Sequence, residues 1–106
     1  MATNIKLNLG DDANQSLTIT PDGAEIRVKL WWQPSDEHWY VHIDVHKADL
    51  SYFVFGRRVV VDEALIRLPV VFELGALYCR RRSERSSTIL KRDSFQSTHD
   101  LTYERD

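Results

Sequence analysis

The sequence predicts an all-β fold: a small single-domain β-sandwich or partly open barrel of about seven or eight short antiparallel strands. Three observations support this prediction. β-Branched and aromatic residues gather in short alternating runs. Turn residues separate these runs at intervals of roughly 8–12 residues. The chain has 106 residues, which suits one domain over 1–106 and is too short for separate cofactor and substrate domains.

The clearest element is a hairpin from about residue 24 to 46. Apolar and polar residues alternate on both sides of the turn Pro34-Ser35-Asp36. Because successive side chains point to opposite faces of a strand, one face of each strand must be buried and the other wet. The face expected to be buried consists of Ile26, Val28, Leu30, Trp32, Trp39, Val41, Ile43 and Val45.

Two shorter strands are expected before the hairpin, around 5–9 and 16–20. The turn between them lies at Gly10–Asn14. Pro21-Asp22-Gly23 separates the second strand from the hairpin, since proline presets a negative φ and glycine accepts a positive one.

The pattern after the hairpin predicts a more varied series of elements. Leu50–Phe55 is expected to form a strand that Gly56 ends, and Arg57–Asp62 a strand covered on both sides because Val59-Val60-Val61 is continuous. Asp62–Leu68 is expected to begin a helical turn with Asp62 as its N-cap, ended by Pro69.

The C-terminal part of the chain predicts two further strands. They lie at Ala76–Arg82 and around Leu101 and Tyr103, on either side of a polar loop at Ser83–Ser87. Between the loop and the last strand, Ile89-Leu90 and Phe95 are isolated apolar anchors.

Composition excludes several classes of protein. A single cysteine, Cys79, cannot form an internal disulfide, which argues against a secreted disulfide scaffold. No apolar run approaches ~18 residues, so we expect no signal peptide and no membrane span. Phosphate loops, paired metal cysteines and the common hydrolase motifs are absent from the sequence, so we expect neither enzyme activity nor a cofactor.

Charge is unevenly distributed along the chain and points to a protein partner. The formal net charge is −2, yet Tyr78–Arg92 carries six basic residues and one acidic residue. Nucleic-acid partners are disfavoured because such modules usually carry a basic balance over the whole domain. We predict a protein interface formed by Arg80, Arg81, Arg82, Arg85 and Trp31. Trp31 belongs to this set because it lies on the polar face of its strand, and tryptophan is enriched in contact patches.

Two alternative sites remain open. His42, Asp44 and His46 share one face of a strand and offer the ligand types of a zinc or iron centre, as in a metal-binding cupin-like enzyme. A wet strand face explains the same pattern, and the fourth ligand would have to be a distant residue such as His99 or Cys79. A module for carbohydrate or single-stranded nucleic acid would instead use Trp31 with Tyr40 or nearby basic residues.

Five stretches taken in order resemble a known family. They are Leu30-Trp31-Trp32, Trp39-Tyr40-Val41-His42-Ile43, Gly56-Arg57-Arg58-Val59-Val60-Val61-Asp62, Gly75-Ala76-Leu77-Tyr78 and Leu101-Thr102-Tyr103-Glu104. This order is similar to that of the baseplate plug proteins of contractile-tailed bacteriophages, over about residues 16–104. The chain departs from that family at 46–50, where a turn glycine is missing, and in the weight of its arginine run.

The resemblance implies a structural role without chemistry. It implies a virion protein of the tail baseplate, present in the host cytoplasm before assembly, whose partners are the hub, tube and spike proteins. Two-faced strands would then fill a core with one face and bind neighbours with the other.

Overall fold

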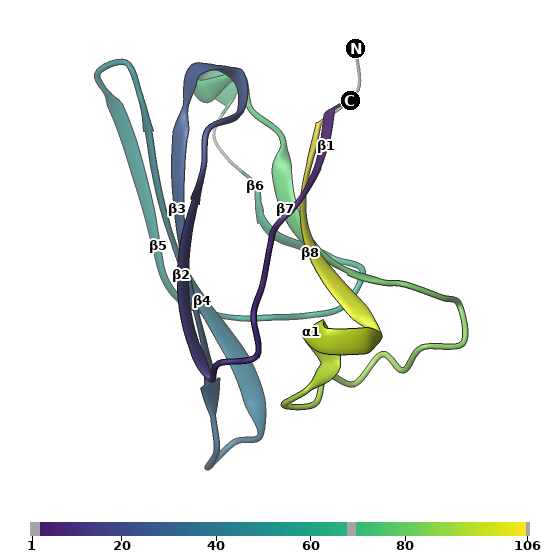
Figure 1. Cartoon of the computed structure of the whole chain (residues 1–106). Coiled ribbons are helices and arrows are strands. Elements are labelled where there is room, and N and C mark those ends of the chain that lie inside the picture. The colour runs from purple at the N-terminus through teal and green to yellow at the C-terminus, as the bar shows by residue number, and fades with distance from the viewer. Residues whose placement is uncertain (1–2, 68–69, 106) are drawn as a thin grey trace.

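The computed structural model describes residues 3–67 and 70–105, which form two antiparallel sheets packed face to face (Figure 1). Sheet I has the strand order β1-β8-β7-β6 and sheet II the order β2-β3-β4-β5. The strands are β1 (Thr3–Lys6), β2 (Asn14–Ile19), β3 (Glu25–Gln33), β4 (His38–Lys47), β5 (Leu50–Arg58), β6 (Ala64–Arg67), β7 (Ala76–Arg81) and β8 (His99–Arg105). The sheets do not close into a barrel, and the prediction of a small all-β sandwich is confirmed.

Sheet II contains the predicted hairpin. β3 and β4 pair in register, with Ile26 opposite Val45 and Leu30 opposite Val41. The inward side chains of both strands are buried as the alternation predicts, except Trp32, which is half-buried against the core, and the outward ones are exposed or half-buried. β2 and β5 pair with the outer sides of this hairpin and form the two edges of the sheet.

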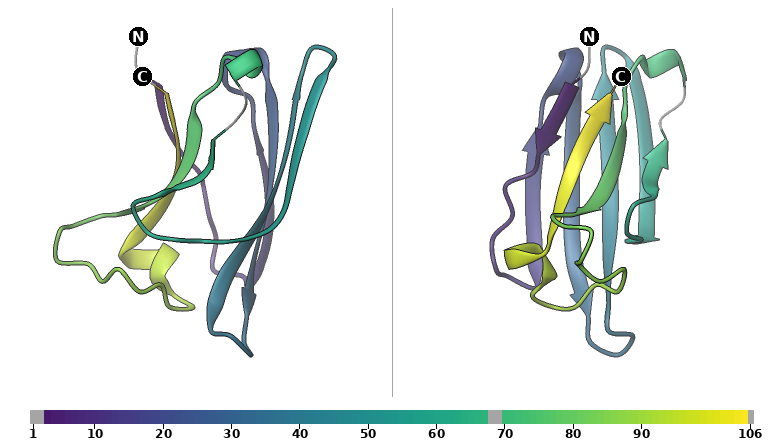
Figure 2. Two further views of the ribbon diagram at one scale, coloured as in Figure 1. Left: turned by 180° about the vertical axis from the view of Figure 1, so that it is seen from behind. Right: turned by 90° about the vertical axis from the view of Figure 1, so that its right-hand side faces the viewer.

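Sheet I brings the two ends of the chain together. β1 pairs with β8 so that Thr3 lies opposite Arg105, and Figure 2 shows these strands side by side. Leu101 and Tyr103 of β8 are fully buried. The Tyr103 hydroxyl accepts a hydrogen bond from the Gly75 amide at 2.8 Å, which fixes the entry into β7.

The core lies between the sheets, and one end is closed by the segment that leads into β8. Trp39 is 1% exposed, its indole Nε1 donates to the Lys91 carbonyl at 3.0 Å, and its ring meets Phe95 edge-on. Phe95 lies on the one-turn helix α1 (Ser94–Ser97). The predicted anchors Leu90 and Phe95 are therefore buried, whereas Ile89 is exposed.

Three predictions for residues 56–68 were wrong. Gly56 does not end β5, because its φ of +66° accommodates a bulge and the strand continues to Arg58. Beyond Arg58, the segment 57–62 forms no strand that is covered on both faces. Val59 and Val61 are buried, Val60 is exposed, and Val61 forms one isolated bridge to Cys79, because this segment crosses from sheet II to sheet I.

The predicted helical turn over 62–68 is also replaced by a strand. Residues 64–67 form β6, which pairs with β7 on the side away from β8. Asp62 is no N-cap: its φ is +61°, and its amide donates to the Cys79 carbonyl. A tertiary partner thus decided between helix and strand. Leu68 and Pro69 lie outside the described residues.

The helices of the described residues are all short. None of them has the length and apolarity needed to cross a membrane.

Candidate interface on the outer face of sheet II

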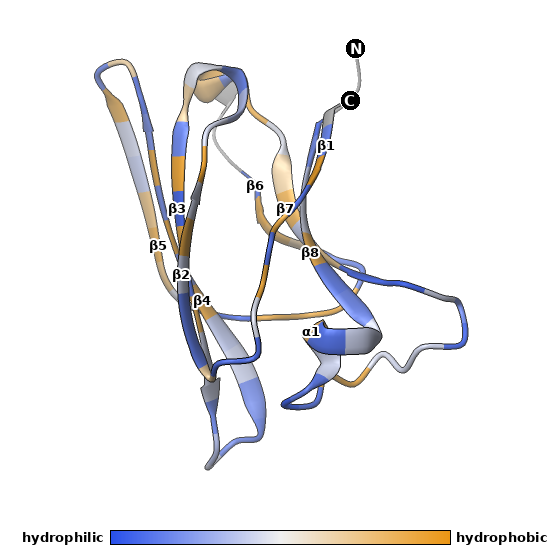
Figure 3. Ribbon diagram, in the orientation of Figure 1, coloured by the Kyte–Doolittle hydropathy of each residue, from blue (hydrophilic) through white to orange (hydrophobic). Residues whose placement is uncertain are grey.

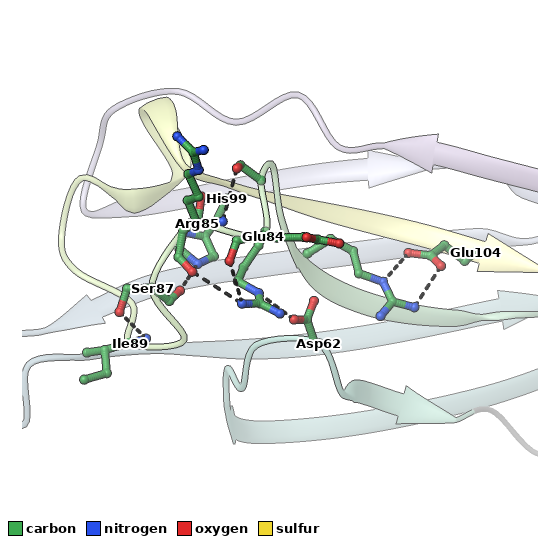
Figure 4. A network of polar contacts seen from close by, with 11 residues as sticks. Asp62, Glu84, Arg85, Ser87, Ile89, His99 and Glu104 are labelled. Carbon is green, nitrogen blue, oxygen red and sulfur yellow. Dashed lines mark hydrogen bonds and ion pairs between the residues drawn. The ribbon is translucent and has the colours of Figure 1, made fainter.

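Two arginines of the predicted interface are bound to acids of the neighbouring strand. Arg80 donates from Nε and Nη2 to the two oxygens of Glu104, at 2.9 and 3.0 Å (Figure 4). Its guanidinium lies over the Tyr78 ring. Arg82 contacts Asp100 at 3.0 Å. These pairs lie on the outer face of sheet I, where β7 and β8 run side by side.

The other two arginines of the run differ from each other. Arg81 donates to Asp62 at 2.8 Å and also approaches the Glu84 and Ser86 carbonyls, so it ties the loop after β7 to the crossover segment. Arg85 points away from this network (Figure 4). An interface on these arginines stays a prediction, but the structure gives three of them partners within the chain.

The three residues of the metal hypothesis share a face without converging. The His42 Nδ1 accepts a hydrogen bond from the Gly56 amide at 2.9 Å, while His46 Nε2 contacts Asp44 at 3.1 Å. Among residues 3–67 and 70–105, no three His, Cys, Asp or Glu side chains are close enough to hold one ion.

The two distant candidates for a fourth ligand are occupied or inert. His99 is buried and uses both ring nitrogens, toward the Thr98 hydroxyl and the Ser87 carbonyl. Cys79 is also buried, and burial raises the pKa of its thiol to about 12, which disfavours the thiolate form.

Trp31, by contrast, belongs to a continuous row of rings on the outer face of sheet II. We call this row the aromatic ridge; it consists of Trp31, Tyr40, His42, Phe53 and Phe55. The Trp31 ring stacks on Tyr40 with centroids 5.8 Å apart, and it meets His42 at 4.5 Å. His42 in turn contacts Phe55 at 3.9 Å and Phe53 at 6.1 Å. The ridge therefore crosses β3, β4 and β5.

Two phenylalanines of the ridge project into solvent. Phe53 is 57% exposed and Phe55 is 74% exposed. Figure 3 shows the hydrophobic character of β5 along the free edge of the sheet. Sequence reasoning placed both residues in a strand but did not predict that they are exposed, because this strand shows no clear alternation. The sequence does contain one signal of exposed apolar residues. Residues 50–55 are apolar at both odd and even positions, although they pair with an amphipathic strand across a tight turn.

A shallow hollow of about 360 Å³ lies beside the ridge. Its lining includes Ser16 and Thr18 of β2, Arg27 of β3, His42 and Asp44 of β4, and Phe53 of β5. Lys29 also lines it, opposite His42 on the neighbouring strand. The outer face of sheet II thus carries exposed aromatic side chains next to a hollow. An exposed apolar patch of this kind indicates a binding surface.

A family model described as cyanophage baseplate Pam3 plug gp18 matches residues 2–106. The chain belongs to this family of baseplate plugs. No curated protein matches the sequence. The resemblance of the five sequence stretches is confirmed, and the chain is a structural protein of the phage baseplate. Membership implies a location in the tail of the virion and assembly with other tail proteins.

The fold explains two stretches that carry the resemblance to baseplate plugs. At Gly75, a side-chain Cβ would lie 2.0 Å from the Glu104 carbonyl oxygen, so that β7 can approach β8 only with glycine there. Tyr103 supplies the hydroxyl to which the Gly75 amide donates. The two stretches therefore form one contact between neighbouring strands.

Proposed function

We propose that the chain is a non-enzymatic subunit that joins the baseplate from the host cytoplasm and binds a neighbouring hub, tube or spike protein through the aromatic ridge. The observation that supports this is the exposure of Phe53 and Phe55 next to Trp31. Aromatic residues in a contiguous exposed patch are typical of protein interfaces, where they supply most of the binding free energy.

The opposite face of the sandwich supports this choice by contrast. Arg80 and Arg82 on sheet I are paired with acids of β8, and Lys6 also contacts Asp100 at 3.4 Å. These arginines already have partners within the chain, so they are less available to a second protein. Exposed ion pairs also contribute little to the free energy of binding. Sheet II presents apolar surface whose burial is favourable.

The test is assembly of baseplates with the double variant Phe53→Ser and Phe55→Ser. We expect its incorporation to fall at least about tenfold, since two interface aromatics are lost. The matched control is Ile89→Ser, because Ile89 is 67% exposed but lies away from the ridge. Near-ultraviolet circular dichroism checks that both variants are folded. Normal incorporation of the double variant would overturn the proposal, and so would an equal loss with the control.

A further inference from the structure

The charges around the aromatic ridge indicate what the partner surface contains. Lys29 and Arg58 point outward on this face, opposite His42 and Tyr40 respectively. Neither forms an ion pair with a carboxylate among residues 3–67 and 70–105. Arg58 instead contacts the ring of His38. Two cations thus lie beside the ridge without an ion-pair partner in the described part of the chain.

The acids of the same face are already engaged. Glu25 binds Arg27 at 2.5 Å, Asp44 contacts His46 at 3.1 Å, and Asp36 accepts a hydrogen bond from the Tyr40 hydroxyl of the ridge. Among the described residues, this face therefore offers Lys29 and Arg58 no free acid with which to pair. Complementary charge across an interface speeds encounter and suppresses wrong partners.

The free edge of β5 is less suited to binding a partner than the outer face, because a partner there would have to add a strand to sheet II. Phe55 and Gly56 together lie opposite His42, which makes a bulge, and Gly56 has a positive φ. Arg57 and Arg58 follow directly. Bulges and charges on an edge strand both oppose strand addition. The outer face, rather than the edge, is then the accessible docking surface.

A second copy of the chain does not fit this face. In a two-fold dimer each copy presents the same patch, so Lys29 and Arg58 of one copy would face a surface whose acids Glu25, Asp36 and Asp44 are already engaged. What this face lacks is a free carboxylate, and an acidic partner supplies it.

Resting on the proposed function, we propose that the aromatic ridge binds an acidic segment of a neighbouring tail protein. Apolar side chains of that segment cover Phe53 and Phe55, and its Asp or Glu side chains pair with Lys29 and Arg58. The hollow beside Phe53, whose lining includes Arg27 and Lys29 as well as Asp44, lies next to the pairing that we assign to Lys29.

A zero-length carbodiimide cross-linker tests this directly, because it joins a lysine amine only to a carboxylate in contact with it. The full-length chain is assembled with the tail proteins encoded alongside it, treated, and analysed by mass spectrometry. We expect a cross-link from Lys29 to an Asp or Glu of a tail protein. A cross-link from Lys29 to a second copy of this chain, or recovery of the assembled partner without any cross-link at Lys29, would overturn the proposal.

Charge reversal gives an independent readout. Lys29→Glu with Arg58→Glu is expected to reduce partner binding about tenfold at low salt. The control, Arg67→Glu with Lys91→Glu, makes the same change in net charge at exposed positions outside the ridge. Full binding by the first variant would overturn the acidic partner, as would binding of a dT10 oligonucleotide that competes with the tail protein.

The two proposals fail in different ways. Loss of binding in the Phe53 and Phe55 variant, together with full binding after charge reversal, leaves the interface in place and removes its acidic partner. Full binding by both variants removes the interface itself.

Discussion

Gly75 shows how a single residue sets the distance between two strands. Its amide donates to the buried Tyr103 hydroxyl at 2.8 Å, and the space for a Cβ is filled by the backbone of Glu104. Neither β7 nor β8 can move away without losing their shared hydrogen bonds. The requirement for glycine here comes from a close approach between strands and not from an unusual φ.

We therefore expect Gly75→Ala to destabilise the protein by more than about 2 kcal/mol, because a backbone atom must shift. Urea unfolding followed by fluorescence measures this. Gly10→Ala is the control, since a Cβ at Gly10 would make only an ordinary 3.7 Å contact with Gln15. An equal loss for both variants would contradict the close approach.

His42 couples the aromatic ridge to the bulge of β5. Burial among its neighbours, and to a lesser degree the nearby Lys29 ammonium, lower the pKa of His42 below its ordinary 6.5. The folded protein thus favours the neutral ring, whose Nδ1 accepts the Gly56 amide hydrogen. Protonation would replace that acceptor by a donor.

The sign of the pH dependence follows from the lowered pKa. The folded state binds the proton less readily than the unfolded state, so the contribution of His42 is complete above pH 6.5 and is lost as the pH falls below 6.5 toward the lowered value. We expect His42→Gln to show a smaller loss of stability than the parent chain between about pH 6.5 and 5. Identical pH profiles from urea unfolding would refute this coupling.

At the scale of elements, alternation predicted the strands whose two faces differ. β3 and β4 were predictable because each buried side chain is followed by a wet one. β6 was not, because its four residues are too few to show a period and their conformation depends on pairing with β7. The Val59–Val61 run looked like a buried strand, whereas it crosses between sheets, where β-branched residues pack without a ladder.

The turn between β4 and β5 is the first of two places where the sequence departs from the family pattern. Ala48 stands where a turn glycine was expected, and it adopts a φ of +54°. A side chain in this region costs about 1–2 kcal/mol, part of which is offset by the lower entropy of alanine in the unfolded chain. The tight connection is therefore retained under local strain.

Ala48→Gly should consequently stabilise the protein by about 0.5–1 kcal/mol in urea unfolding. The comparison variant is Ala64→Gly on β6, where φ is not positive and the same substitution is expected to destabilise. A loss of stability in both variants would show that Ala48 is not strained.

The arginine run is the second departure, and its pairs hold β7 to β8. Hydrogen bonds from Arg80 are the main cause of the lowered pKa of Glu104, with the Thr102 hydroxyl adding to it. A sequence shows six cations and one acid in this stretch but not the acids of β8, which lie 18 to 24 residues away. The pairings were therefore beyond sequence reasoning.

We expect Glu104→Gln to cost about 1 kcal/mol at neutral pH, since it replaces a forked charged pair. Because the pKa of Glu104 is lowered, this contribution is present above pH 4.5 and is lost as the pH falls below it. The stability difference between parent and variant should therefore shrink in acid. Glu84→Gln, in the exposed loop, is the control; an equal cost there would contradict the role of the pair.

At the scale of the whole molecule, the two outer faces have different characters. Sheet I carries acids and bases that neutralise one another, and sheet II carries exposed rings beside unpaired cations. Sequence reasoning placed Trp31 correctly on a polar face, but it could not assemble the aromatic ridge, because Phe53 and Phe55 join it only through the register of β5 on β4. The interface is a property of the sheet and not of any one strand.

The most direct test of the docking face is hydroxyl-radical footprinting of the free chain and of the assembled baseplate. We predict that oxidation of Phe53 and Phe55 falls strongly on assembly, while Ile89, which is 67% exposed in the free chain, stays reactive. Undiminished oxidation of both phenylalanines, with protection confined to the Arg80–Arg85 side of the sandwich, would contradict the account and return the interface to the arginine run.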